Sequence, residues 1–108
     1  MVGRSGWFGD YNDPTTFLNL CRSNDGHNHS GFNDPKYDAL LSEAAAERDP
    51  IKRLEILSRA EQYVVEDQMP ILPVFTYVTV FAWRPNVTGI YPNSRLQLPL
   101  YCIGVKRP

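Results

Sequence analysis

The sequence has little of what would place a chain of 108 residues in a well-marked class. Two cysteines, Cys21 and Cys102, are too few for a disulfide framework, which leaves open either two unpaired thiols or one bridge. No apolar run reaches the roughly 18 residues of a membrane-spanning helix. The opening residues 1–6 contain no apolar h-region, so we expect this chain to have no signal peptide.

Neither sign of charge is in excess. Lys and Arg total 11 and Asp and Glu total 12, which gives a formal net charge of −1. A near-neutral chain without a basic cluster is a poor nucleic-acid binder, so we expect no nucleic-acid partner. The common phosphate-binding, hydrolase, redox and zinc-protease motifs are absent. What is present, 43% hydrophobic and 21% charged residues, is the composition of a globular chain rather than a disordered one.

The polar loop over residues 22–30 holds both histidines, His27 and His29. A metal site there would need further ligands, and Cys21 and Asp25 are the only near candidates. We therefore expect a solvated loop and no bound metal.

Asp10 and Asp13 form a pair of acids in a turn. As catalytic carboxylates they would need an apolar pocket to raise the pKa of one of them, and the pattern offers none. Asp13 more simply caps the turn at Pro14, whereas Asp10 follows the aromatic pair Trp7 and Phe8. An acid beside aromatic rings can hold a cationic group against their faces.

Residues 34–68 predict a helical hairpin. Asp34 with Pro35, and Asp49 with Pro50, each pair a good N-cap residue with a proline at the first helical position. Apolar residues then recur at helical spacing after each proline. We expect helices over about 35–48 and 50–67, because Pro70 cannot continue the second one.

The last third of the chain is strand-like. Residues 71–83 are rich in β-branched and aromatic side chains on both faces, which predicts a strand buried on both sides or facing a lined cavity. A shorter strand is expected over about 101–106. Together these elements predict a single α+β unit, in which the helical hairpin packs on a small mixed β-sheet and the strand around Tyr77 is central.

Several short segments of this chain, taken in order, resemble a known protein family. They are similar to segments of bacterial extracytoplasmic solute-binding proteins of the oligopeptide/dipeptide-binding family, which deliver substrates to ABC transporters. The segments are Gly6–Leu18, which reads W-x-x-D-Y-x-x-P-x-x-F-L from Trp7, and then Asn28–Leu41, Arg53–Leu57 with Ala60–Gln62, Met69–Phe75 and Arg84–Gly89. Members of that family are several times longer and have two lobes. The resemblance implies that this chain is their C-terminal portion, either an excised fragment or a truncated product.

The resemblance also implies a ligand site. Asp10 matches the acid that holds the peptide α-ammonium in the oligopeptide-binding branch, and Trp7 matches the pocket tryptophan. The backbone from Gly6 to Phe8 matches an extended stretch that pairs with the peptide main chain. Tyr77 matches a cleft-lining tyrosine. Simple core aromatics remain the alternative for Trp7 and Tyr77, and Phe8 stands where oligopeptide binders can carry a cysteine.

These implications lead to a function. We expect a non-enzymatic chain that binds a peptide or another small solute without a cofactor or metal. Its full-length relatives would work with an ABC permease in the periplasm or another extracytoplasmic place. One alternative is a truncated interaction module that forms a homodimer through the face left by the missing lobe. A small hydrolase that uses Asp10 and Asp13 is the other.

Overall fold

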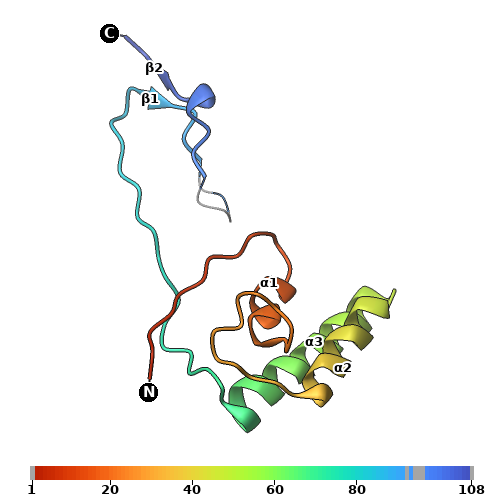
Figure 1. Ribbon diagram of the computed structural model, residues 1–108. Helices are drawn as coiled ribbons and strands as arrows, with labels where there is room; N and C mark the ends of the chain where they lie inside the picture. Colours follow the sequence, from red (N-terminus) through yellow and green to blue (C-terminus); the bar gives the residue numbers. More distant parts are fainter. Residues whose placement is uncertain (1, 92, 94–96, 108) are drawn as a thin grey trace. The chain divides into compact units, whose positions relative to one another are not determined.

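The computed structural model describes residues 2–91, 93 and 97–107 (Figure 1). Two compact units divide the chain, Met1–Val74 and Phe75–Pro108. The first unit holds the α-helices, and the described residues of the second form two short strands and one 3₁₀ turn. In the first unit the elements are α1 (Thr15–Leu18), η1 (Asn19–Cys21), α2 (Pro35–Ala46), α3 (Pro50–Gln62) and the π-helical turn η2 (Tyr63–Gln68). In the second they are β1 (Val87–Thr88), η3 (Leu100–Cys102) and β2 (Gly104–Val105).

Both long helices begin at the Asp-Pro pairs. The Asp34 carboxylate accepts the backbone N–H groups of Lys36 and Tyr37 at 2.7 and 3.3 Å, and Pro35 takes the first helical position. Capping of this kind satisfies N–H groups that have no partner within the helix. Asp49 does the same for α3, where it accepts the N–H groups of Ile51 and Lys52 at 2.9 and 3.3 Å.

The ends of the helices have local causes too. Helix α2 ends at Ala46, short of the expected residue 48, because Glu47 is extended and its carboxylate accepts the N–H groups of Arg48 and Asp49. Helix α3 passes into η2, which ends at Met69 in the left-handed conformation, φ 49°. The Met69 N–H closes the last turn on the Val64 carbonyl at 3.1 Å, immediately before Pro70.

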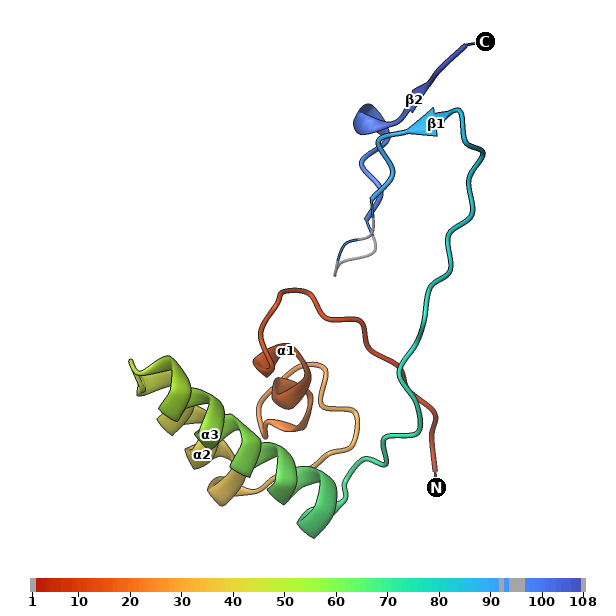
Figure 2. The ribbon, with the colours of Figure 1, turned by 180° about the vertical axis from the view of Figure 1, so that it is seen from behind.

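Helices α2 and α3 lie side by side in both views (Figures 1 and 2). Their apolar faces are covered by the turn-rich residues that precede them. Tyr37 is fully buried, its hydroxyl donates to the Leu18 carbonyl at 2.7 Å, and the Phe32 ring meets the Tyr37 ring edge-on with centroids 5.8 Å apart. The core consists of Leu18, Cys21, Tyr37, Leu41, Ala44, Ile56, Leu57, Ala60 and Val64.

The α+β prediction holds in its coarse form, since the chain is helical with a small two-stranded sheet. The predicted strand over 71–83 is wrong. All of these residues are described and none lies in a strand, and Val78 and Val80 are 84% and 85% exposed. β-propensity reflects packing against neighbouring strands rather than an intrinsic backbone preference. The described part of the chain supplies no strand alongside this segment.

The sheet that is present is antiparallel rather than mixed. Val87 pairs with Val105 and Thr88 with Gly104. The predicted strand over 101–106 is thus reduced to Gly104–Val105, preceded by η3. Gly89 has φ +82°, and a Cβ there would lie 1.8 Å from the Cys102 carbonyl oxygen, so the turn beside β1 requires glycine.

Two further observations complete the fold. Cys21 and Cys102 are both free, the first buried and the second exposed. Of the two alternatives that the sequence left open, the structure therefore has the two unpaired thiols rather than the bridge. Burial raises the pKa of the Cys21 thiol. Among the residues described, no helix combines the length and apolar character that crossing a membrane requires.

The N-cap of α3 can be tested directly. Asp49→Ala removes the acceptor for two N–H groups and should lower the free energy of unfolding by about 1 kcal/mol. Asp49→Asn keeps a side-chain oxygen at the cap and is the matched control, with little change expected. The measurement is the urea midpoint followed by far-UV circular dichroism. An unchanged midpoint in Asp49→Ala would show that the cap does not contribute to stability.

Candidate ligand-binding segment

The segment from Gly6 to Asp10 lies in no helix or strand and leads into α1. Gly6 and Asp10 are exposed, Phe8 is 59% exposed, and Trp7 is half-buried. Of the five residues predicted to contact a ligand, all but Tyr77 lie on this continuous stretch. All of these four except Trp7 are exposed to solvent.

Contacts with α1 hold the end of this stretch. The Asp10 backbone N–H donates to Oγ1 of Thr16 at 3.0 Å, and Thr16 is only 5% exposed. A Cβ at Gly9 would lie 3.3 Å from the Thr16 methyl group, so the backbone passes close to the helix. The main chain of Asp10 is thus fixed, while its carboxylate stays at the surface. This role of Thr16 could not be predicted from the sequence, because nothing in the local pattern distinguishes it from Thr15.

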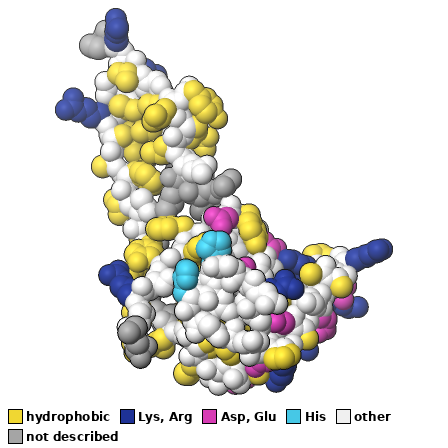
Figure 3. Space-filling model, in the orientation of Figure 1, with side chains coloured by type: hydrophobic (Ala, Val, Ile, Leu, Met, Phe, Trp, Pro, Cys, Tyr) yellow, Lys and Arg dark blue, Asp and Glu magenta, His cyan; other side chains and the backbone are white. Residues whose placement is uncertain are grey.

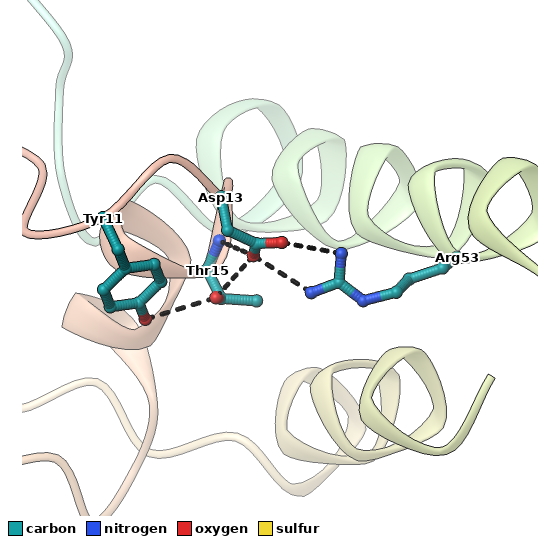
Figure 4. A network of polar contacts seen from close by, with 4 residues as sticks. All are labelled: Tyr11, Asp13, Thr15 and Arg53. Atoms are coloured by element: carbon teal, nitrogen blue, oxygen red, sulfur yellow. Dashed lines mark hydrogen bonds and ion pairs between the residues drawn. The ribbon is translucent and has the colours of Figure 1, made fainter. Parts of the chain in front are cut away.

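Asp13 ties this region to α3 (Figure 4). Its carboxylate forms a two-point ion pair with Arg53, at 2.7 Å from Nη1 to Oδ2 and 3.0 Å from Nη2 to Oδ1. The Thr15 hydroxyl and backbone N–H also donate to Oδ1, at 2.6 and 3.0 Å. Because the Thr15 hydroxyl proton is used in this way, the Tyr11 hydroxyl is the donor in its 3.2 Å contact with Thr15 Oγ1.

These contacts determine the charge on Asp13. The hydrogen bonds from the Arg53 guanidinium, and then those from Thr15, hold the pKa of Asp13 well below its usual range despite partial burial. The same pair raises the pKa of Arg53. A carboxyl group with a lowered pKa is poorly suited to donate a proton near neutral pH. Asp13 therefore caps the turn, as expected, and in addition anchors it to α3.

His27 lies against Trp7. The two ring centroids are 4.9 Å apart with an interplanar angle of 57°, although His27 remains 60% exposed. Histidine side chains are visible at the surface in Figure 3. The sequence pattern predicts a solvated loop here, but it does not predict the ring contact, because the two residues lie 20 positions apart. Within the described ranges, no group of three or more His, Cys, Asp or Glu side chains is arranged to hold a metal ion.

Tyr77 belongs to the second unit. Its ring is 43% exposed and meets Phe75 edge-on, with centroids 5.0 Å apart. It is neither part of a strand nor a buried core aromatic, so the prediction of a central strand around Tyr77 is wrong. Apolar side chains gather on the visible face of this unit (Figure 3).

The Asp13–Arg53 pair predicts a pH-dependent stability. Because the pKa of Asp13 is lower in the folded chain, the pair stabilises the fold above the ordinary carboxyl range and loses this contribution as pH falls toward the folded pKa. Asp13→Asn should therefore lower the urea midpoint at pH 7. Its difference from the parent chain should shrink as pH falls below about 4.

Glu43→Gln provides the control for this experiment. Glu43 forms a single, exposed contact with Arg59 at 3.3 Å, so its removal should change the midpoint little at either pH. A difference between Asp13→Asn and the parent that stays constant down to pH 2 would contradict the assignment.

Comparison with known proteins identifies the family. No family model matches the chain, and no solved structure matches it. The oligopeptide-binding protein OppA of Bacillus subtilis is 39% identical over 91 residues, which is 83% of this chain. The periplasmic murein peptide-binding protein MppA of Escherichia coli is 40% identical over 84% of the chain, and the periplasmic oligopeptide-binding protein OppA of the same organism is 36% identical over 82%.

The match covers a small part of these relatives. The chain spans 16% or 17% of the length of the curated proteins named above. Within that span the similarity runs over most of this chain, as the order of its motifs implies. By this similarity the chain belongs to the oligopeptide- and dipeptide-binding protein family, of which it represents about one sixth of a member's length.

Proposed function

We propose that the segment from Gly6 to Asp10 binds peptides as part of an ABC-transporter substrate-binding protein. The single observation that carries this proposal is Asp10, an exposed carboxylate on a fixed backbone beside Trp7 and Phe8, in a chain whose relatives are named for binding peptides. A non-enzymatic role agrees with those names. The proposed place of action is the periplasm or another extracytoplasmic compartment, with an ABC permease as the partner of the complete protein.

In this proposal Asp10 accepts a hydrogen bond from the α-ammonium group of the peptide. Hydrogen bonds between two charged groups are short and roughly twice as strong as neutral ones. Trp7 and Phe8 supply an apolar wall that lowers the local dielectric and strengthens the contact. The Thr16 bond to the Asp10 backbone and the Asp13–Arg53 pair support the binding segment before the ligand arrives, which reduces the entropy lost on binding.

The backbone from Gly6 to Phe8 would pair with the main chain of the peptide. The segment is in no helix or strand, and pairing of this type uses N–H and C=O groups that every peptide carries. Such a contact is indifferent to side chains and suits a receptor of broad specificity. Tyr77 remains a separate proposed ligand contact within the second unit, supported by its family match and its exposed ring.

The charge on Asp10 is the test of this function. Asp10→Asn keeps the shape of the side chain and removes its charge. In a closed, two-lobed protein the loss of tripeptide affinity should be about 2–4 kcal/mol, because a buried ammonium is left unpaired. In the 108-residue chain the site stays wet, and the loss should be at most about 1 kcal/mol. Calorimetry with a tripeptide provides the measurement.

Two controls sharpen this test. Asp67→Asn makes the same change of net charge at an exposed position on η2 and should leave affinity unchanged. N-acetylation of the peptide should mimic Asp10→Asn, and the two changes together should not add, because both remove one contact. Equal binding of acetylated and free peptides by the two-lobed protein would show that Asp10 does not hold the ammonium.

A second candidate function rests on the apolar segment over residues 71–83. We propose that this segment mediates association of two copies of the chain. Leu72, Val74, Val78 and Val80 are each at least 77% exposed. Contiguous exposed apolar residues are uncommon on isolated soluble proteins and mark interaction surfaces or aggregation sites. A backbone without a neighbouring strand is also a template for pairing with another chain.

Association should depend on the apolar side chains of this segment. The parent chain should dimerise or aggregate in light scattering, whereas Val78→Lys with Val80→Lys should remain monomeric at the same concentration. Thr76→Lys with Thr79→Lys adds the same charge in the same segment without removing apolar area, and should retain more association. A parent chain that is a stable monomer at all concentrations rules out this function.

A further inference from the structure

The contact between His27 and Trp7 joins the proposed ligand segment to the polar loop. The ring centroids are 4.9 Å apart and the planes are tilted by 57°. Trp7 is the half-buried aromatic of the segment, and its orientation decides which face of the indole would meet a ligand. Any residue that sets this orientation would therefore influence the site without touching the ligand.

The His27 ring is held in place from its own side. Asp25 Oδ1 accepts the His27 backbone N–H at 2.8 Å and also lies 3.4 Å from Nδ1 of the ring. Asn28 donates to the Arg22 carbonyl at 3.0 Å and to the Phe32 carbonyl at 2.7 Å. Phe32 in turn packs against the buried core. Through Asn28 and Phe32, the loop that carries the His27 imidazole is therefore connected to the core.

Trp7 has no comparable polar anchor. Its Nε1–H is buried and finds no acceptor among the residues described. An indole whose N–H is unpaired is not oriented by a directional bond, so ring contacts determine how it lies. In the described part of the chain, the ring that lies against the indole of Trp7 is the imidazole of His27.

We propose that His27 is the positioning residue for Trp7, and that protonation of its imidazole tightens the contact. An imidazolium is attracted to the face of an indole, and its charge also pairs with Asp25. Because histidine is the side chain that most readily changes its charge near neutral pH, the proposal predicts that the orientation of Trp7 depends on pH. The consequence for peptide affinity rests on the function proposed above, but the contact itself does not.

Other charged residues lie close in sequence to Trp7 and to His27. Arg4 and Asp10 flank Trp7, and Arg22, Asp25 and His29 share the loop with His27. Asp25 lies close to the ring in geometry as well as in sequence, with its Oδ1 3.4 Å from Nδ1 of His27. His29, whose N–H donates to the His27 carbonyl at 2.8 Å, has no recorded ring contact with Trp7 and provides the matched control.

The experiment follows the Trp7 indole N–H resonance of the full 108-residue chain by NMR between pH 5 and 8, without ligand. The resonance is assigned with Trp7→Phe. It should titrate in the parent and in His29→Gln, and its titration should disappear in His27→Gln. A resonance that does not move in the parent, that still titrates in His27→Gln, or that stops titrating in His29→Gln overturns the proposal.

A second measurement tests the contact if the His27→Gln variant does not fold. In Trp7→Leu the ring protons of His27 should lose the shift caused by the indole ring current, while those of His29 should not change. An unchanged His27 spectrum in this variant would also overturn the contact.

Binding of trialanine separates the two proposals. If both are correct, His27→Gln should remove a difference of about two- to fivefold in affinity between pH 5 and pH 7, a range in which the α-ammonium group of trialanine stays largely protonated. If Trp7 titrates as described but trialanine binds equally well with and without N-acetylation, the positioning role stands and the ammonium-binding function fails. If acetylation weakens binding but the parent and His27→Gln have the same pH profile, the function stands and the positioning role fails.

Discussion

The hydrogen bond from the Tyr37 hydroxyl to the Leu18 carbonyl is the contact on which the first unit depends. Both residues are buried, so breaking the bond would leave the Tyr37 hydroxyl without this acceptor inside the core. Burial raises the pKa of Tyr37, which keeps the hydroxyl protonated and able to donate. Through this bond and the packing around it, the turn at the end of α1 is fixed to α2. The residues before α1 take their position from that turn.

Two acids extend this arrangement to the surface, and each has more than one partner. Asp34 caps α2 and also accepts the Tyr63 hydroxyl at 2.8 Å, which joins the start of α2 to the start of η2 and lowers the pKa of Asp34. Asp13 caps the turn before α1 and binds Arg53 of α3. The proposed ligand segment is therefore attached to the hairpin at a turn whose geometry is set by both charge and hydrogen bonding.

The second unit is organised differently, because no residue in its described part is buried. A unit without buried side chains has little hydrophobic free energy to offset the conformational entropy of its backbone. Within its described residues, the contacts that order it include the short β1–β2 ladder and the turn at Gly89. The exposed apolar side chains of Val78 and Val80 belong to this unit.

Local chemistry by itself determined where the two helices begin, because an aspartate that accepts N–H groups and a proline with a preset φ act within a few residues of chain. The order of short motifs likewise indicated the family, which the comparisons show. Only the tertiary structure decided that Arg53 meets Asp13 from 40 positions away, that His27 lies against Trp7, and that residues 71–83 form no strand. Contacts between distant residues depend on the path of the chain between them, and a strand needs a neighbour that its own sequence cannot supply.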